Sequence, residues 1–258
     1  MEPALKTHVS DGTATVTISN IGKRNAMTLQ MWRDLPPLLE RLAGDRAVRQ
    51  LVLTGEGGTF CAGADIGSLR EPSGVSPGPT VAAAEEALAA FPGPTLAAIR
   101  GYCVGGGCQL AAACDLRFAE EGTLFGVTPA KLGVVYPASA TRRLVRLIGP
   151  SAAKYLLFSG ELIDCARALR TGLVDEVLPE GELDKRVAEF AAVLGGRSLL
   201  TQTAAKELAN GTWDVPSRVA EERGAYWAAQ ARESGDTLEG AAAFLERRAP
   251  RFTWRGEQ

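Results

Sequence analysis

The stretch "YCVGGGCQLAAACD" (102–115) sets three consecutive glycines between a short apolar run and an alanine-rich helical pattern. If a strand ends at residue 104 and a helix starts at the glycines, the first N–H groups of that helix have no partners and favour nearby negative charge. Glycine also lets a ligand approach the backbone closely. No side chain before Asp115 ionises at neutral pH, so chemistry within this stretch has to use the main chain.

Glycines between a strand and a helix can also serve two different purposes. Dense packing of the strand against the helix selects glycine as well, and the stretch alone leaves that role open. A dinucleotide-binding fingerprint does not fit, because Gly105 and Gly107 are followed by Leu110 where the third glycine belongs.

A second turn, "GTFCAGADI" (58–66), follows a strand-like run and places Ala62, Gly63 and Ala64 at another tight backbone corner. If the two turns face each other, amides from both converge on one oxygen. Such an oxyanion hole stabilises an enolate or a tetrahedral intermediate, and each donor contributes about 3 kcal/mol. It needs no ionisable side chain.

Strands and helices alternate around these turns. The strand patterns cover residues 13–19, 50–55, 95–101 and 115–121, and the helical patterns cover residues 27–45, 80–90 and 107–114. In the first helical pattern, Pro36 and Pro37 are expected to begin a new turn or to kink the helix. This alternation predicts an α/β fold with a parallel sheet.

The remaining segments predict helices and one loop. Residues 71–80, rich in Pro, Gly and Ser, are expected to form a mobile loop. After residue 138 the patterns are mostly helical, and one apolar face is formed by Leu183, Val187, Phe190 and Leu194. Asp236 is expected to cap the last helix, with Glu239 as its reciprocal partner.

Composition narrows the class of protein. The 258 residues are 46% hydrophobic with a formal net charge of −2, which is typical of a soluble globular protein and predicts neither a nucleic-acid nor a membrane partner. No signal peptide or run of roughly 18 apolar residues is present, so we expect a cytoplasmic location. The five cysteines form no CxxC pair and are expected to be buried free thiols. His8 is the single histidine, so we expect no metal site and no catalytic triad.

Six segments together resemble the crotonase superfamily, also called the enoyl-CoA hydratase/isomerase family. They are "GKRNAMT" (22–28), "FCAGADI" (60–66), "AIRGYCVGGGCQLAAACDLRFA" (98–119), "FGVTPAKLGVVYP" (125–137), "TGLVDEVLP" (171–179) and "GAAAFLERRAPRF" (240–252). The resemblance implies a spiral of ββα units that binds acyl-CoA (1–195) and a C-terminal helical oligomerisation region (196–258). It also implies a homotrimer or a dimer of trimers, with no cofactor beyond the coenzyme A of the substrate.

The resemblance also suggests site residues. The N–H groups of Ala64 and Gly106, next to Gly105, would hold the thioester oxygen. The segment that meets the phosphates and pantetheine of coenzyme A would contain Lys23, Arg24 and Ala26, and the segment beside the adenine would contain Ala62, Asp65 and Ile66. Thr128 is a candidate polar contact to the acyl group.

Two departures from the family pattern alter the expected chemistry. Hydratases of this family carry one glutamate at the end of "GGGCE", where this chain has Gln109, and another in "FGxPE", where it has Pro129. Glutamine can orient a water molecule but cannot accept a proton, and proline has no polar side-chain group. A two-carboxylate hydration mechanism therefore cannot be transferred to this chain.

The run "TPAKLGVVYP" is similar to the methylmalonyl-CoA decarboxylases of the superfamily, which use the tyrosine aligned with Tyr136. Those enzymes carry a histidine where Ala64 stands, and Tyr136 also fits a half-buried packing role. Loss of carbon dioxide from a malonyl-type thioester yields the enolate without a base. We therefore expect a lyase that acts through a thioester enolate, with decarboxylation or another base-free reaction. The alternatives are a slow hydratase with water held by Gln109 and Tyr136, and a non-catalytic acyl-CoA-binding oligomer.

Overall fold

The computed structural model describes residues 2–65, 67, 78–211 and 217–256. Within these ranges six strands form a sheet in the order β1-β2-β3-β4-β6-β8, in which β1 is antiparallel to β2 and every later pair is parallel. The strands of this sheet are β1 (Ala4–Ser10), β2 (Thr13–Ser19), β3 (Gln50–Gly55), β4 (Thr95–Ile99), β6 (Leu116–Glu120) and β8 (Glu176–Leu178). The predicted α/β fold with a parallel sheet is confirmed.

A second, two-stranded sheet pairs β5 (Tyr102–Val104) with β7 (Leu124–Gly126) in parallel. Each of its strands follows a strand of the main sheet and leads into a helix, so that β4, β5 and α3 (Gly106–Ala113) repeat the arrangement of β6, β7 and α4 (Pro129–Leu132). These are ββα units, as the family resemblance implies.

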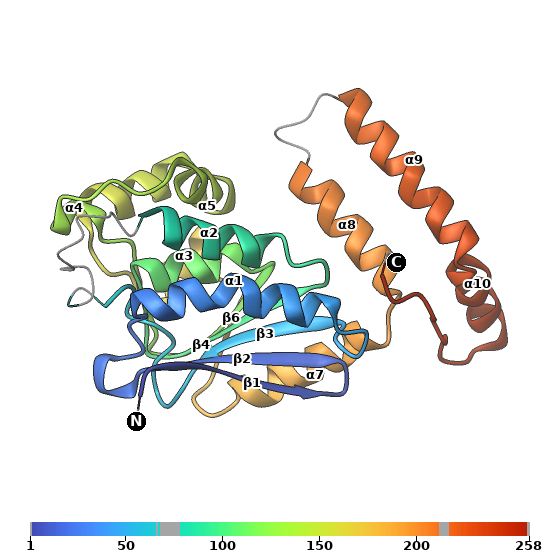
Figure 1. The fold of residues 1–258 in the computed structure, drawn as a ribbon, viewed down its shortest axis with the longest axis horizontal. Coiled ribbons are helices and arrows are strands. Elements are labelled where there is room, and N and C mark those ends of the chain that lie inside the picture. Colours follow the sequence, from blue (N-terminus) through green and yellow to red (C-terminus); the bar gives the residue numbers. More distant parts are fainter. Residues whose placement is uncertain (1, 66, 68–77, 212–216, 257–258) are drawn as a thin grey trace.

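Helices cover both faces of the main sheet (Figure 1). Figure 1 shows α1, α2 and α3 on one face and α7 on the other. The other helical elements of the described residues are η1 (Ile21–Lys23), α1 (Leu29–Gly44), α2 (Gly78–Ala89), α5 (Ala138–Ser159), α6 (Cys165–Thr171), α7 (Leu183–Gly195), α8 (Leu199–Gly211), α9 (Ser217–Glu233) and α10 (Asp236–Glu246).

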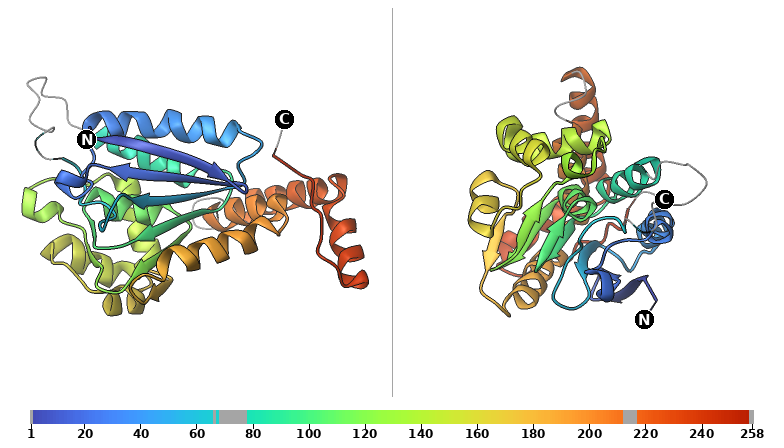
Figure 2. Two further views of the ribbon diagram at one scale, coloured as in Figure 1. Left: turned by 90° about the horizontal axis from the view of Figure 1, so that it is seen from below. Right: turned by 90° about the vertical axis from the view of Figure 1, so that its left-hand side faces the viewer.

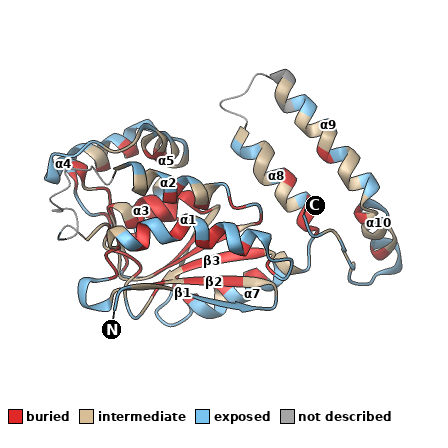
Figure 3. Cartoon of the chain, in the orientation of Figure 1, coloured by how far each residue is buried: buried red, intermediate tan, exposed pale blue. Residues whose placement is uncertain are grey.

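Alternating residues of the central strands supply two separate cores. Leu51 and Leu53 of β3 lie in the core beneath α1–α3, whereas Val52 between them lies in the core beneath α7. Because both faces are covered, β3 and β4 are buried almost throughout, as expected for parallel strands. Figure 3 shows the buried residues concentrated along these strands and the helices above them. The predicted apolar face of α7 packs on this second core through Leu183, Val187, Phe190 and Leu194.

Helix α1 differs from the prediction at its two prolines. It runs from Leu29 to Gly44 as one helix with Pro36 and Pro37 inside it, although a new helical turn or a kink was expected there. The Thr28 hydroxyl accepts a hydrogen bond from the Met31 amide at 3.3 Å and caps the start of the helix. The continuity is explained by burial on both sides of the prolines, through Met31, Trp32, Leu35, Leu38, Leu39 and Leu42.

The last three helices stand away from the sheet (Figures 1 and 2). A small core of their own contains Leu200, Ala204 and Trp227. The predicted cap of α10 is wrong: Gly235 occupies the N-cap position in a left-handed conformation, and Asp236 is the first helical residue. The Asp236 carboxylate instead accepts a hydrogen bond from the Ser198 hydroxyl at 2.5 Å. None of the helices in the described ranges has the length and apolar character of a bilayer-crossing segment.

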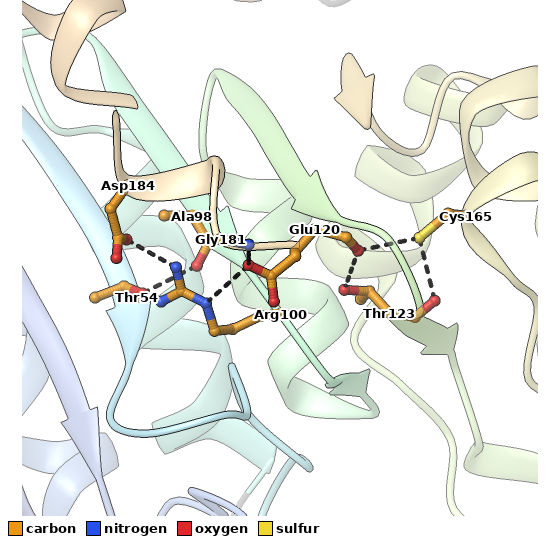
Figure 4. A network of polar contacts seen from close by, with 8 residues as sticks. All are labelled: Thr54, Ala98, Arg100, Glu120, Thr123, Cys165, Gly181 and Asp184. Atoms are coloured by element: carbon orange, nitrogen blue, oxygen red, sulfur yellow. Dashed lines mark hydrogen bonds and ion pairs between the residues drawn. The ribbon is translucent and has the colours of Figure 1, made fainter. Parts of the chain in front are cut away.

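A polar network holds the ends of β4 and β6 and the start of α7 together (Figure 4). Arg100, just after β4, places Nη2 2.8 Å from a carboxylate oxygen of Asp184 and Nε 3.8 Å from Oε2 of Glu120. The same Glu120 oxygen accepts the backbone N–H of Gly181 at 3.0 Å. The corner at Gly101, from which β5 departs, is therefore anchored on one side by charged hydrogen bonds.

Gly107 offers a test of how closely the two glycine turns are packed. A Cβ added to Gly107 would overlap the carbonyl oxygen of Cys61 and lie 2.8 Å from the Cβ of that residue. We expect Gly107→Ala to lower the free energy of unfolding by about 1–3 kcal/mol, because backbone would have to move. Urea denaturation measures the change. In the control Gly44→Ala, the new Cβ meets nothing within 4 Å; equal stability of the two variants would contradict the close packing.

Candidate active site

The two glycine turns lie side by side because the segment before each turn runs parallel to the other. Three backbone hydrogen bonds join them: Phe60 N–H to Arg100 O at 2.8 Å, Cys61 N–H to Tyr102 O at 2.9 Å, and Val104 N–H to Cys61 O at 3.0 Å. The register is that of a parallel bridge between Cys61 and Cys103. Residues 62–64 and 105–107 consequently leave this pairing at the same end.

The backbone amides of Ala64 and Gly106 come close together beyond the paired segment. A Cβ on Gly63 would lie 3.2 Å from the Gly106 nitrogen, and a Cβ on Gly106 would lie 3.8 Å from the Ala64 nitrogen. Met27 pairs with Gly63 and Asp65 but not with the Ala64 amide, and Gly106 is the first residue of α3. Within the described residues neither amide donates a hydrogen bond, so two donors are available at one place.

Two hydroxyl groups face the same turn. A Cβ on Gly105 would lie 3.6 Å from the Tyr136 hydroxyl and 3.8 Å from the Thr128 hydroxyl. Gly105 has φ +58° and ψ −125°, a conformation that side chains with a Cβ rarely adopt. Burial, with smaller contributions from Cys108 and Glu85, raises the pKa of Tyr136 above its ordinary value, although the Thr128 amide opposes the shift. Tyr136 therefore stays protonated at neutral pH and can donate a hydrogen bond.

Gln109 lies one helical turn after Gly106 and is only 1% exposed. Neither its Oε1 nor its Nε2 has a hydrogen-bond partner in the part of the chain that the structure describes. A buried amide left in this state costs about 1–3 kcal/mol. The position of Gln109 beside the glycine turn is one where a bound ligand or water molecule would satisfy it. Pro129, at the other position of interest, is buried as the first residue of α4 and offers no polar group.

The residues expected to hold coenzyme A also lie together. The Lys23 ammonium lies 2.7 Å from the Asp65 carboxylate, and the Arg24 guanidinium lies 4.7 Å from the centre of the Tyr102 ring. The Ala62 amide donates to the Arg24 carbonyl at 3.0 Å, and Ala26 is buried beside them. Residue Ile66 and most of the expected loop, 71–77, lie outside the described residues, while residues 78–80 form the first turn of α2 rather than a loop.

The cysteines and the histidine lie as expected. All five cysteines are buried and carry free thiols. Burial raises the pKa of Cys61 and of Cys114 to about 12, so both stay protonated. His8 is exposed on β1, away from the glycine turns.

The sequence patterns did not single out Glu85, a carboxyl group buried in α2. It is 1% exposed, and its Oε2 lies 3.9 Å from Nη1 of Arg143 with no hydrogen-bond partner among the described residues. Burial raises the pKa of Glu85 to about 7, Arg143 opposes the shift, and Glu86 adds to it. The available signal was helical spacing: Val81, Ala84 and Leu88 form an apolar stripe, and Glu85 falls on it.

Comparison with known proteins agrees with this fold and site. The family model described as enoyl-CoA hydratase/isomerase matches residues 8–255. A 2,3-dehydroadipyl-CoA hydratase from Escherichia coli (strain K12) is 33% identical over 243 residues, covering 93% of this chain and 94% of that protein. An (E)-benzylidenesuccinyl-CoA hydratase from Thauera aromatica is 32% identical over 251 residues, covering 95% and 96%.

Solved structures show the same relationship. A crystal structure described as an enoyl-CoA hydratase/isomerase family member has a TM-score of 0.91 and 36% identity, covering 99% of this chain and 100% of that one. An enoyl-CoA hydratase from Mycobacterium smegmatis has a TM-score of 0.89 and 28% identity, covering 97% and 99%. The chain belongs to the enoyl-CoA hydratase/isomerase family of the crotonase superfamily. It is therefore an enzyme that acts on acyl-CoA.

Proposed function

We propose that the protein holds the thioester oxygen of an acyl-CoA with the amides of Ala64 and Gly106 while that oxygen becomes anionic. The supporting observation is the meeting of these two unpaired donors beside the Tyr136 hydroxyl. Donors fixed in place before the reaction stabilise the enolate more than they stabilise the neutral thioester, which lowers the barrier.

Decarboxylation is the reaction that these residues suit best, which makes the enzyme a lyase. When a malonyl-type thioester loses carbon dioxide, the electrons of the broken C–C bond become the enolate, so no base is needed for that step. Tyr136 stays protonated and can orient the departing carboxylate by a hydrogen bond. The absence of a carboxylate at Gln109 and Pro129 is then compatible with turnover.

A second candidate is slow hydration. It is favoured by the unpaired buried amide of Gln109, which can position a water molecule together with Tyr136, and by the hydratase names of the relatives. Neither Gln109 nor Tyr136 is a base at neutral pH, so this route lacks the proton acceptor that hydration requires.

The proposal extends to coenzyme A and to assembly. Lys23 and Arg24 supply positive charge for phosphate, next to Ala26, Ala62 and Asp65, and Thr128 and Gly105 border the acyl group. A homotrimer or a dimer of trimers would cover the apolar side chains that α10 exposes, Leu238, Phe244 and Leu245. The buried free thiols suit the reducing cytoplasm.

A panel of coenzyme A esters in heavy water distinguishes these functions. We expect methylmalonyl-CoA to lose carbon dioxide and give propionyl-CoA with one deuterium at the α-carbon, and crotonyl-CoA to react slowly or not at all. Mass spectrometry of the esters follows both reactions. Fast conversion of crotonyl-CoA would support hydration instead, and a panel that is unchanged throughout would identify a non-catalytic binding protein.

Tyr136→Phe tests the role of the phenol. Because the variant removes one hydrogen bond to a charged group, we expect methylmalonyl-CoA turnover to fall about 10- to 100-fold. Tyr155→Phe is the matched control, since Tyr155 hydrogen-bonds Glu161 on the surface, and it should leave turnover unchanged. If Tyr136→Phe keeps the full rate with an unaltered melting temperature, Tyr136 is a packing residue.

A further inference from the structure

We propose that Glu85 is the proton-transfer residue of this site, exchanging one proton with the α-carbon of the acyl-CoA thioester that Ala64 and Gly106 hold. This inference rests on the proposed function and assigns it an acid–base group. It places that group on α2, away from the two positions at which the family usually carries glutamate.

The position of Glu85 in the fold supports this role. Helix α2 packs against α3, which begins at Gly106 and carries Gln109, and against α5, which follows Tyr136. Ala84 and Leu88 anchor the same face of α2 in the core. The charge of Glu85 acts on the Tyr136 phenol, whose oxygen borders Gly105. Glu85, Tyr136 and the glycine turn are therefore neighbours.

Glu85 is not the main ion-pair partner of Arg143. Arg143 places Nη2 2.6 Å from Glu86 on the surface of α2, whereas its Nη1 lies 3.9 Å from Oε2 of Glu85, beyond hydrogen-bond distance. Among the described residues both of these inner atoms lack a hydrogen-bond partner. A buried carboxyl group in this state costs stability, so a structural role does not explain it.

The groups around Glu85 set its protonation state. Glu86 on its own helix adds negative charge, Arg143 on α5 adds positive charge, and Tyr136 and Cys108 lie nearby as neutral groups. The buried side chains of α1, which also packs on α2, are apolar. With burial as the largest cause, the pKa of Glu85 rises to about 7. Both its acid and its base form are then populated near neutral pH, which suits proton transfer.

The proton-transfer step balances without any further reactant. As a base, the Glu85 carboxylate takes the α-proton, the C–H electron pair forms the enolate double bond, and the carbonyl π electrons move to the oxygen held by the two amides. As an acid, the neutral carboxyl returns the proton to the enolate carbon. After decarboxylation the second direction completes the reaction, and the Glu85 carboxylate regains its proton from water.

The closing experiment measures α-proton exchange of propionyl-CoA in heavy water, together with carbon dioxide release from methylmalonyl-CoA. We expect Glu85→Gln, a variant of nearly the same shape, to reduce exchange at least 100-fold. Glu85→Asp keeps the carboxyl group and should restore part of the exchange if the variant is folded. Glu86→Gln, one residue further along the same helix, should retain exchange.

The pH profile gives a readout that a packing role would not change. Exchange should rise with pH as Glu85 ionises, with its midpoint near the pKa of that group. Glu86→Gln removes a neighbouring negative charge and should move the midpoint to lower pH. Arg143→Gln removes a positive charge and should move it to higher pH. Opposite shifts from these two variants support the assignment.

The outcomes separate this inference from the proposed function. If Glu85→Gln exchanges as fast as the unmodified protein, or if the unmodified protein releases carbon dioxide without exchanging the α-proton, the inference is overturned and the enolate function stands. If the unmodified protein neither exchanges protons nor turns over any ester, the proposed function is overturned and the inference with it.

Discussion

The site depends on a short piece of parallel backbone pairing between the segments that precede the two glycine turns. Phe60, Cys61 and Val104 donate the hydrogen bonds that hold these segments in register. Because the chain leaves this pairing at the same end on both sides, the amides of Ala64 and Gly106 reach one place. Glycine is required where the backbones touch, since a side chain at Gly107 would overlap Cys61.

The main sheet positions this pairing from behind. The corner at Gly101 passes so close to the Gly58 carbonyl that a Cβ would overlap it, and the network of Arg100, Glu120 and Asp184 fixes the end of β4 just before that corner. Helices α2 and α3 then carry Glu85 and Gln109 into the protein interior. A rigid frame of main-chain donors is thus combined with a few buried polar side chains, which is the arrangement that stabilises an anionic intermediate most effectively.

Much of the fold could be predicted from local patterns. The alternation of Ala14, Val16 and Ile18 predicts β2 because one face of that strand is buried, and the spacing of Leu183 and Val187 predicts the packed face of α7. Strand β1 was missed because its residues are largely exposed and show no alternation. The continuity of α1 through Pro36 and the contact of Asp236 with Ser198 depend on tertiary packing that local propensity does not contain.

The site was predictable to a similar degree. The two glycine turns could be read from the sequence because backbone conformation limits which residues fit there, but their meeting requires the pairing of residues more than 40 positions apart. Glu85 could not be assigned from the sequence alone, because a glutamate on a helix is usually solvated. Its burial follows from helices that pack around it.

The central claim is that the amides of Ala64 and Gly106 bind one thioester oxygen. A crystal structure of the protein with a bound acyl-CoA measures this directly. We predict that the thioester oxygen lies about 2.7–3.2 Å from both amide nitrogens. An oxygen that lies beyond hydrogen-bond distance of either nitrogen, in an otherwise ordered acyl-CoA complex, would contradict the account.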